Sequence, residues 1–256
     1  MHALIETFQA IVGRRHVLVG DRQTRRFRKG YRFGEGRVLA AVRPGSLVEQ
    51  WRVIQACVAH DIIVIVQAAN TGLTGGSTPD GEGYDRPIVI INTMRMDRVD
   101  LLDEGRQVLC LPGATLDKLE KRLRDIGREP HSVIGSSCIG ASVTGGVCNN
   151  SGGSLIRRGP AYTQLALFAQ VDSAGKLHLV NHLGIELGGD AEEILQRLDK
   201  ADYGPADVLG SDNQWASDRG YHEHVRDVDA STPARFNADP RRHYEASGSA
   251  GKIAVF

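Results

Sequence analysis

The sequence lacks the features that mark three large classes of protein. Lys and Arg together number 31, as do Asp and Glu, so no net charge attracts nucleic acid or an anionic lipid surface. The few basic clusters, such as residues 25–29, are short and are expected to be solvated faces or, at most, local phosphate contacts. No apolar run approaches the roughly 20 residues that a membrane-spanning helix requires. The N-terminal segment carries Glu6 and no long apolar core, so we expect no secretory signal peptide.

Cysteines are few, and their spacing argues against structural zinc. The four stand at positions 57, 110, 138 and 148, without a C-x-x-C pair or a histidine at zinc-finger spacing. We infer a reducing compartment from this usage. Cys57 and Cys110 lie among apolar residues and are expected to fill small gaps in the core.

Common catalytic and nucleotide-binding motifs are also missing. No G-x-G-x-x-G opens a helix after a strand, and no serine stands in G-x-S-x-G, so the Rossmann and hydrolase signatures fail. Residues 248–252 resemble a P-loop, but Ala246 replaces its first glycine and Ile253 its magnesium-binding hydroxyl.

Histidines give only weak candidates for a site. His222 and His224 would share one face of a strand and could bind a metal, although no nearby Cys or carboxylate cage supports this. His131 precedes a glycine-rich stretch, where it either lines a site or is a hydrogen-bonded structural histidine.

The first positive signal is a glycine-rich stretch, residues 67–77, QAANTGLTGGS. It follows the apolar run of residues 62–66, which predicts a buried strand. Small side chains and glycines let several backbone N–H groups face a bulky anion, because glycine adds no Cβ and permits positive φ. The pattern therefore indicates either a phosphate-binding loop or a plain turn.

A second glycine-rich stretch, residues 131–159, favours the phosphate-binding alternative. Apolar residues continue between its glycines, so it is not a flexible linker. It is typical of backbone packed closely against a flat, polar-edged ligand, with Ser136 or Ser137 capping a short helix. Two such loops would suit one extended dinucleotide.

Hydrophobic periodicity predicts alternating helices and strands over most of the chain. A capping box at Ser46 opens one helix, and the strands on either side of it should be parallel in a β-α-β unit. Residues 20–37 are polar and basic, and we expect a surface loop there. The predicted helices are 3–13, 47–60, 116–126 and 191–200, and the predicted strands are 38–42, 62–66 and 87–92, with hairpins at 98–111 and 164–180.

Residues 248–256 end the sequence in an apolar, strand-like run without a following turn or polar tail. Natural domains rarely end inside a core strand, so we expect the chain to be cut short at this point.

Four stretches together resemble a known family, the bacterial quinone-dependent D-lactate dehydrogenases, which are respiratory flavoenzymes. They are QAANTGLTGGSTPDG (67–81), the long stretch from GREPHSVIG to RRGPAYT (127–163), TPARFNADPRR (232–242) and GKIAVF (251–256). The resemblance spans essentially the whole chain but only the N-terminal portion of the family. It implies an α+β fold, a two-lobed FAD-binding domain of the vanillyl-alcohol-oxidase or PCMH type.

The same resemblance implies the lobes and the cofactor site. The first lobe would be residues 1–130 with the pyrophosphate loop at 67–77, and the second residues 131–256, truncated at its C-terminal strand, with FAD held between them. We expect the FAD to be non-covalent, since residues 61–83 contain no His or Cys. We also expect Cys138 and Cys148 to pack as inert thiols in the second lobe. The implied FAD-binding residues are Ala68, Ala69, Asn70, Thr71, Gly72, Gly76 and Ser77 on the pyrophosphate, and Gly135, Ser142, Gly152 and Val255 beside the rest of the cofactor.

The implied function is oxidation of D-lactate, or a similar 2-hydroxy acid, to pyruvate, with electrons passed to a membrane quinone. The catalytic base is not identified. The family resemblance suggests a peripheral position on the cytoplasmic side of the inner membrane, with membrane contact expected only for the full-length proteins and a cytoplasmic location for this chain alone. A second hypothesis is a truncated flavin-binding module without turnover, lacking the substrate- and membrane-binding region.

Overall fold

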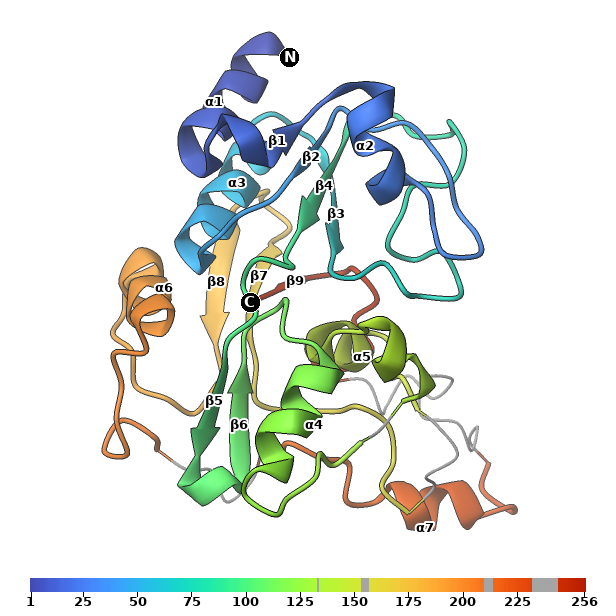
Figure 1. Ribbon diagram of the computed structural model, residues 1–256, viewed down its shortest axis with the longest axis vertical. Helices are drawn as coiled ribbons and strands as arrows, with labels where there is room; N and C mark the ends of the chain where they lie inside the picture. The colour runs from blue at the N-terminus through green and yellow to red at the C-terminus, as the bar shows by residue number, and fades with distance from the viewer. Residues whose placement is uncertain (133, 153–156, 210–213, 232–243) are drawn as a thin grey trace. The chain divides into compact units, whose positions relative to one another are not determined.

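A four-stranded sheet organises the N-terminal part of the chain. In the computed structural model, which describes all residues except 133, 153–156, 210–213 and 232–243, its strand order is β1-β2-β4-β3. Strands β2 and β3 both pair with β4 in parallel, and β1 pairs antiparallel with β2 (Figure 1). The predicted β-α-β unit is therefore confirmed as parallel, with β4 inserted between its two strands. The strands are β1 (Val17–Leu18), β2 (Ala40–Val42), β3 (Ile63–Gln67) and β4 (Ile88–Asn92).

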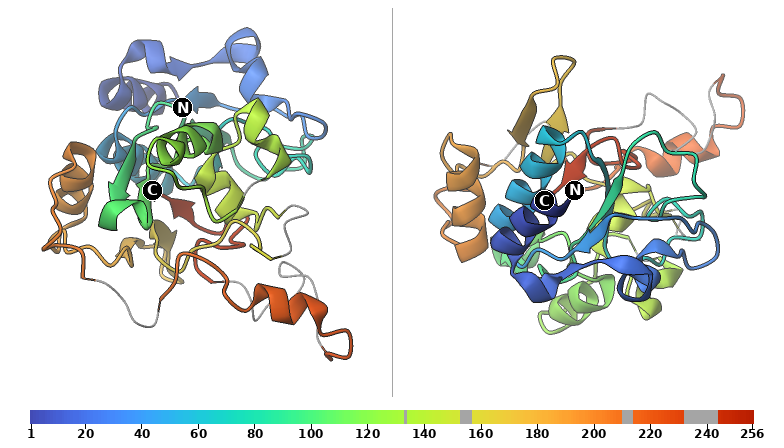
Figure 2. Two further views of the ribbon diagram at one scale, coloured as in Figure 1. Left: turned by 60° about the horizontal axis from the view of Figure 1, so that its bottom comes forward. Right: turned by 90° about the horizontal axis from the view of Figure 1, so that it is seen from above.

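Helices cover both faces of this sheet, which explains its unbroken β-branched strands. Helices α1 (His2–Val12) and α3 (Leu47–Ala59) pack together on one side, and α2 (Gly20–Arg28) lies on the other (Figures 1 and 2). Phe27 of α2 packs against Ala41 and Ile90. All five residues of β4 are buried as a result.

The expectation of a surface loop over residues 20–37 is wrong in its first half, where α2 forms. Thr24 and Phe27 are buried at spacing i, i+3, and the Oγ1 of Thr24 donates to the carbonyl of Gly20 at 2.8 Å. The other side chains are polar and leave the helix too little apolar pattern to be seen in the sequence. One aromatic anchor is enough because the sheet supplies the rest of the contact.

Helix α3 begins as the capping box predicts and is bonded to a distant helix. Ser46 Oγ accepts from the N–H of Glu49 at 3.1 Å. The carboxylate of Asp199, in α6 (Ala191–Lys200), accepts from the N–H groups of Leu47 at 2.9 Å and Val48 at 3.3 Å. These bonds satisfy N–H groups that have no partner inside the helix.

The remaining described elements form a hairpin, a second sheet, three short α-helices and three 3-10 helices. Hairpin β5–β6 packs its apolar side on α4, where Val99, Leu119 and Leu123 are buried together. In the second sheet the strand order is β8-β7-β9, with β9 antiparallel to β7. The elements are β5 (Val99–Leu102), β6 (Gln107–Cys110), α4 (Leu116–Arg124), α5 (Val143–Cys148), β7 (Leu167–Val171), β8 (Leu177–Asn181), α7 (Tyr221–Arg226), β9 (Ala254–Val255) and the 3-10 helices η1 (Arg14–His16), η2 (Asp103–Gly105) and η3 (Gly135–Ile139).

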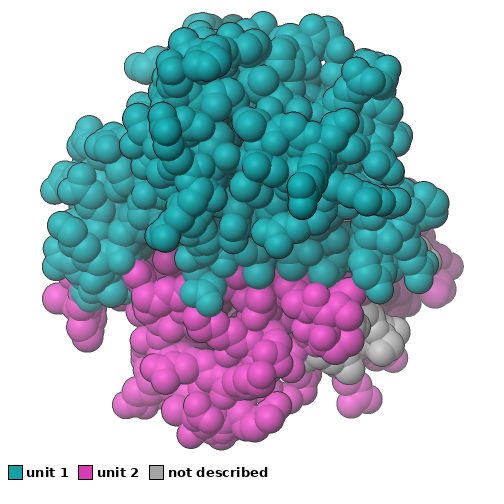
Figure 3. Space-filling view, turned by 45° about the horizontal axis from the view of Figure 1, so that its top comes forward, with its two compact units in different colours: residues 1–97, 171–178, 187–203 teal, residues 98–170, 179–186, 204–256 magenta. Residues whose placement is uncertain are grey.

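Contacts divide the chain into two compact units, and each unit is built from three separate segments. The boundaries between these segments differ from the expected single boundary at residue 130. The hairpin and α4 belong to unit 2 because they share a core with Val143, whereas α6 belongs to unit 1 because it bonds α3. Both units mix helix and strand, which confirms the α+β class. Unit 1 is residues 1–97, 171–178 and 187–203, and unit 2 is residues 98–170, 179–186 and 204–256 (Figure 3).

Across the part of the chain that the structure describes, no helix combines the length and apolar character needed to cross a membrane.

Candidate cofactor site

The first glycine-rich stretch lies at the carboxyl edge of the parallel strands of unit 1. Residues 68–77, called here the glycine loop, begin directly after Gln67, the last residue of β3. In open sheets of this kind, ligands bind beyond the carboxyl ends of the strands. The prediction of a strand followed by a loop is therefore confirmed, and the loop is where a ligand is expected.

The glycine loop leaves its backbone donors unused. None of the N–H groups of residues 68–77, all of which the structure describes, donates to another protein group. Its carbonyl oxygens are instead partly occupied, since Ala68, Gly75 and Ser77 each accept a hydrogen bond through theirs. A run of free N–H groups is the chemistry that binds the oxygens of a phosphate.

Two glycines of the loop border open space. A Cβ added at Gly72 or Gly76 would meet no protein atom within 4 Å, and neither residue has a positive φ. Gly75 is different, because its φ is 78° and a Cβ there would lie 3.0 Å from the carbonyl oxygen of Phe33. The fold therefore requires a glycine at position 75 but not at positions 72 and 76.

Asn70 fixes the middle of the glycine loop. It has φ 56°, in the left-handed region that asparagine tolerates better than most residues. Its Nδ2 donates to the carbonyl of Lys29 at 2.8 Å, and its Oδ1 accepts from the Oγ of Ser77 at 2.8 Å. These bonds tie the loop to itself and to the segment that follows α2.

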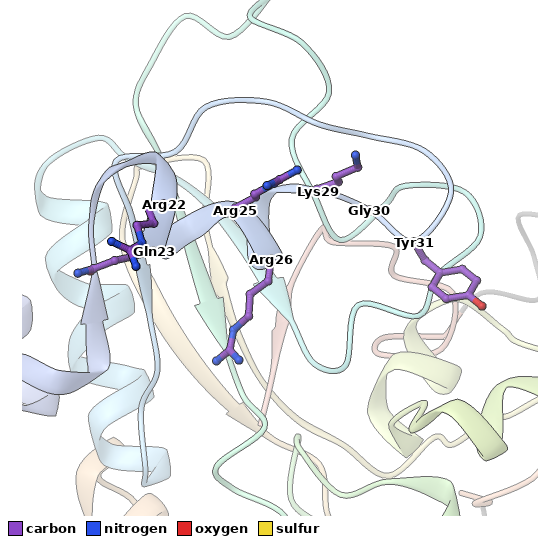
Figure 4. Close-up of a pocket in the computed structure, with 7 residues that line it drawn as sticks. All are labelled: Arg22, Gln23, Arg25, Arg26, Lys29, Gly30 and Tyr31. Carbon is purple, nitrogen blue, oxygen red and sulfur yellow. The ribbon is translucent and has the colours of Figure 1, made fainter.

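An open pocket on α2 lies apart in sequence from the glycine loop and contains none of its residues. Its cations are exposed, as expected for a solvated basic face, and Figure 4 shows the Arg26 side chain directed away from those of Arg25 and Lys29. Exposed charges are screened by water and salt, so this pocket is a weaker candidate than the loop. It is lined by Arg22, Gln23, Arg25, Arg26, Lys29, Gly30 and Tyr31.

In unit 2, the second glycine-rich stretch builds α5 and its surroundings. The helix cap is Ser142, whose Oγ accepts from the N–H of Gly145 at 2.9 Å, rather than Ser136 or Ser137, which lie inside η3. Sequence alone could not choose among these serines, since all precede small or apolar residues. A Cβ on Gly146 would lie 3.2 Å from that of Ala161, so a larger residue on this packed face of α5 would require Ala161 to shift.

The structure gathers three of the four expected unit 2 residues around α5. Ser142 caps it, Gly152 follows it, and Val255 of β9 shares a buried cluster with Val147. The fourth, Gly135, begins η3, which contacts α4 instead. In unit 1, the expected residues Ala68, Ala69, Asn70, Thr71, Gly72, Gly76 and Ser77 all lie in the glycine loop.

The cysteines differ in environment. Burial raises the pKa of Cys57 and Cys110 to about 12, and it also raises the pKa of Cys148. Cys57 and Cys110 are core residues, as predicted. Cys138 is exposed, so the expectation that it packs in unit 2 is wrong; it lies near the end of η3, where the chain turns at the surface.

The histidine candidates gain little from the structure. His222 and His224 lie in α7, a helix rather than the expected strand, and so do not share a strand face. Burial, and then the charge of Arg158, lower the pKa of His131, which keeps it neutral near pH 7. No group of three or more His, Cys, Asp or Glu side chains among the described residues could hold a metal ion.

Sequence reasoning missed two side chains beneath the glycine loop, Gln67 and Asn92. Both are amides at the carboxyl ends of apolar runs, and both are buried. The available signal was their equivalent position: each directly ends a β-branched strand, where an amide side chain has to find partners in the loop that follows.

Comparisons with known proteins identify the family to which the chain belongs. A family model described as an FAD binding domain matches residues 38–181. The chain is 58% identical over 253 residues to the quinone-dependent D-lactate dehydrogenase of Haemophilus influenzae and 57% identical over 254 residues to that of Escherichia coli. Each alignment covers 99% of this chain but 45% and 44% of the relative, respectively, so the chain spans less than half the length of these curated relatives.

Two solved structures show the same fold at low sequence identity. Alkyldihydroxyacetonephosphate synthase superposes with a TM-score of 0.60 at 17% identity, covering 76% of this chain and 37% of that one. p-Cresol methylhydroxylase superposes with a TM-score of 0.53 at 19% identity, covering 74% of this chain and 36% of that one. The expected PCMH-type fold is thereby confirmed.

Proposed function

Because the chain belongs to the FAD-binding domain family, we propose that it holds FAD by the diphosphate on the glycine loop and serves a D-lactate:quinone oxidoreductase. The free N–H groups of residues 68–77 carry the first part of this proposal. A diphosphate needs several donors within one short stretch, and oriented backbone amides supply them without a compensating cation. The open space at Gly72 and Gly76 provides room for the phosphate oxygens.

The individual contacts are proposed from the resemblance and are supported by the loop's geometry. Ala68, Ala69, Asn70, Thr71, Gly72, Gly76 and Ser77 would surround the diphosphate. Gly135, Ser142, Gly152 and Val255 would contact the rest of the cofactor. Three of the latter group lie around α5.

FAD, when bound, supplies the chemistry of the reaction by accepting a hydride equivalent from a carbon bearing a hydroxyl group. The residues of this chain bind and orient it. A separate group has to take the hydroxyl proton of the substrate, and general bases in such reactions act within hydrogen-bonding reach of that proton. No residue of the chain is assigned to this role.

The substrate and the electron acceptor are proposed from the names of the relatives. All three curated relatives, at 54–58% identity, are named quinone-dependent D-lactate dehydrogenases. Identity at this level along nearly the whole chain supports the same substrate class, a D-2-hydroxy acid, and a quinone acceptor. It also favours an oxidoreductase over a flavin-binding module without turnover.

The experiment that tests the function is anaerobic reduction of the bound flavin. The protein is loaded with FAD, freed of excess, and mixed with D-lactate while the flavin absorbance near the visible maximum is followed. L-lactate serves as the matched control. Bleaching with D-lactate alone, reversed by a soluble quinone, is the expected result. A protein that binds FAD but is not bleached by any 2-hydroxy acid would contradict the proposed reaction.

A quinone acceptor also implies a location. Respiratory quinones dissolve in the bilayer, so we propose that the whole protein works peripherally at the cytoplasmic face of the inner membrane. Fractionation of cells should place it with inner membranes at low salt and release it without detergent. Recovery only in the soluble fraction at every salt concentration would contradict this location.

A further inference from the structure

Two buried amide side chains lie side by side under the glycine loop. Gln67 ends β3 and Asn92 ends β4, and their Cα atoms are paired in the parallel ladder. Their side chains are among the least exposed polar groups of the chain, with relative exposures of 1% for Gln67 and 4% for Asn92. Buried amides are costly unless their hydrogen-bonding groups are satisfied, so their partners show what they do.

The amide of Gln67 holds the far end of the glycine loop. Its Nε2 donates to the carbonyl of Ser77, the last loop residue, at 2.7 Å. The same nitrogen donates to the carbonyl of Phe27, at the end of α2, at 2.8 Å. Both amide hydrogens are therefore used, and one side chain draws two distant pieces of backbone onto the end of β3.

The amide of Asn92 holds the near end of the loop. Its Nδ2 donates to the carbonyl of Ala68, the first loop residue, at 2.8 Å, and lies 3.4 Å from the Oε1 of Gln67. The two amides are thus also linked to each other. Together they turn the first and the last carbonyl of the loop toward the sheet.

This arrangement has a consequence for what the loop presents to a ligand. Carbonyl oxygens that faced the ligand would repel a phosphate, whereas N–H groups attract it. Gln67 and Asn92 remove the carbonyl oxygens of Ala68 and Ser77 from that face. No backbone N–H group of residues 68–77, all of which are described, donates a hydrogen bond to the protein. Hydrogen bonds within the protein therefore hold the loop in its donor-presenting conformation.

We propose that Gln67 and Asn92 are positioning residues that preorganise the glycine loop for the diphosphate of the cofactor. This inference rests on the proposed function of the loop. Both side chains are buried beneath the backbone they hold, so they act through it and not by touching the cofactor. A preorganised loop has less conformational entropy to lose on binding, which raises affinity without adding a contact to the ligand.

The alternative is that Gln67 and Asn92 have a purely structural role, in which their hydrogen bonds only stabilise the core of unit 1. The two roles differ in what a substitution changes. A core role predicts a lower stability and an unchanged affinity per folded molecule. A positioning role predicts a weaker affinity for any ligand that carries the diphosphate, whatever happens to stability.

The test compares Gln67→Met and Asn92→Leu, both of which add no charge near the diphosphate, with a matched control, Gln50→Met. Each of the first two removes the donor but keeps the side-chain size. Gln50 is also fully buried in unit 1, but it lies in α3, away from the glycine loop in sequence. Urea unfolding without ligand gives the stability of each variant. Titration with FAD, with ADP and with riboflavin separates the diphosphate from the flavin ring system.

The expected result is that Gln67→Met and Asn92→Leu weaken binding of FAD and of ADP by similar factors, about tenfold or more for the loss of two hydrogen bonds. Gln50→Met should lower stability and leave both affinities unchanged. Bound ADP should also show a shifted ³¹P resonance in the two loop variants. Wild-type protein that binds neither FAD nor ADP would refute the proposed function itself.

Two outcomes would overturn the positioning role while leaving the proposed function intact. The first is unchanged ADP affinity in both loop variants. The second is failure of both variants to fold, which would assign the pair to the core. A further measurement needs no variant: if the amide hydrogens of residues 68–77 exchange equally fast in wild-type protein with and without saturating ADP, the loop does not present its donors to the diphosphate, and the proposed cofactor site fails together with the positioning role.

Discussion

The Oγ of Ser77 donates a hydrogen bond of 2.8 Å to the Oδ1 of Asn70, so the last residue of the glycine loop is bonded to its third. Asn70 in turn donates from Nδ2 to the carbonyl of Lys29 at 2.8 Å. The bond between Ser77 and Asn70 therefore closes the loop, and the bond to Lys29 fixes the closed loop to the chain beyond α2. Asn70 makes both bonds from a left-handed backbone conformation, with φ 56°.

A double-mutant cycle at Asn70 and Ser77 should reveal coupling. We expect Asn70→Ala and Ser77→Ala each to weaken FAD binding, and the double variant to cost less than the sum by about 1 kcal/mol, the usual net value of one hydrogen bond. Isothermal titration with FAD measures the four affinities. If the changes in the free energy of FAD binding were strictly additive, the bond between Asn70 and Ser77 would contribute nothing to FAD binding.

Gly72→Val and Gly76→Val should each reduce flavin occupancy to below about a tenth while leaving the unfolding midpoint unchanged. A loss of about 1.4 kcal/mol in the free energy of FAD binding already lowers the affinity tenfold. A Cβ at either position would meet no protein atom within 4 Å, so the added side chain is expected to displace the ligand and not the protein. Absorbance of the purified, FAD-loaded proteins gives the occupancy. Gly189→Val, at another glycine with nothing within 4 Å, is the matched control and should bind normally. Full yellow colour in both loop variants would make the loop a plain turn.

All flavin should leave the protein on acid precipitation. Residues 61–83 contain no His or Cys that could form a covalent link there, and burial keeps Cys148 a neutral thiol. The supernatant and the washed pellet are compared by absorbance after loading with FAD. A pellet that stays yellow would contradict non-covalent binding, and the Cys138→Ser variant would then show whether the exposed thiol is responsible.

Iodoacetamide at pH 8 should alkylate Cys138 well before Cys57 and Cys110. A raised thiol pKa favours the neutral, unreactive form, and with pKa values of about 12 both buried thiols stay protonated at this pH. Peptide mass spectrometry after timed quenching gives the order of labelling. In urea all four should react at similar rates, and early labelling of Cys57 in the folded protein would contradict its burial.

Asp199→Ala should destabilise unit 1 by about 1–2 kcal/mol, the usual cost of losing acceptors at a helix N-terminus. Its carboxylate accepts from Leu47 and Val48 of α3, so the loss reaches a helix far away in sequence. Asp202→Ala is the control, because this exposed carboxylate lies 3.9 Å from Arg197 in a solvated pair. Equal unfolding midpoints for the two variants in urea would contradict the role of Asp199.

Local signals in the sequence were enough for most elements of the fold. Unbroken β-branched runs gave the parallel strands, and Ser46 gave the start of α3, because strand propensity and capping depend on nearby residues only. Helix α2 could not be found this way. Its only large apolar side chain is Phe27, and that residue indicates a buried helix only once the sheet on which it packs is known.

In the candidate site, too, the local features could be predicted from the sequence and those that depend on distant residues could not. The glycine loop was visible because glycines, small residues and a preceding strand are contiguous. The hydrogen bonds that Gln67 and Asn92 make to it were not, because they depend on two strands pairing in register. The boundary between the units was also out of reach, since it is decided by contacts such as that of Asp199 with α3, between residues more than a hundred positions apart.

Because unit 1 takes its last segment from residues 187–203, it cannot complete its fold in the order in which the ribosome delivers it. The sheet and the glycine loop are synthesised first, yet the carboxylate that caps α3 comes from Asp199, after most of the chain of unit 2 has emerged. The nascent protein therefore carries an unfinished α3 N-terminus while unit 2 is being made. If FAD binds the glycine loop as proposed, early binding would stabilise that intermediate by mass action and give the cofactor a part in biogenesis.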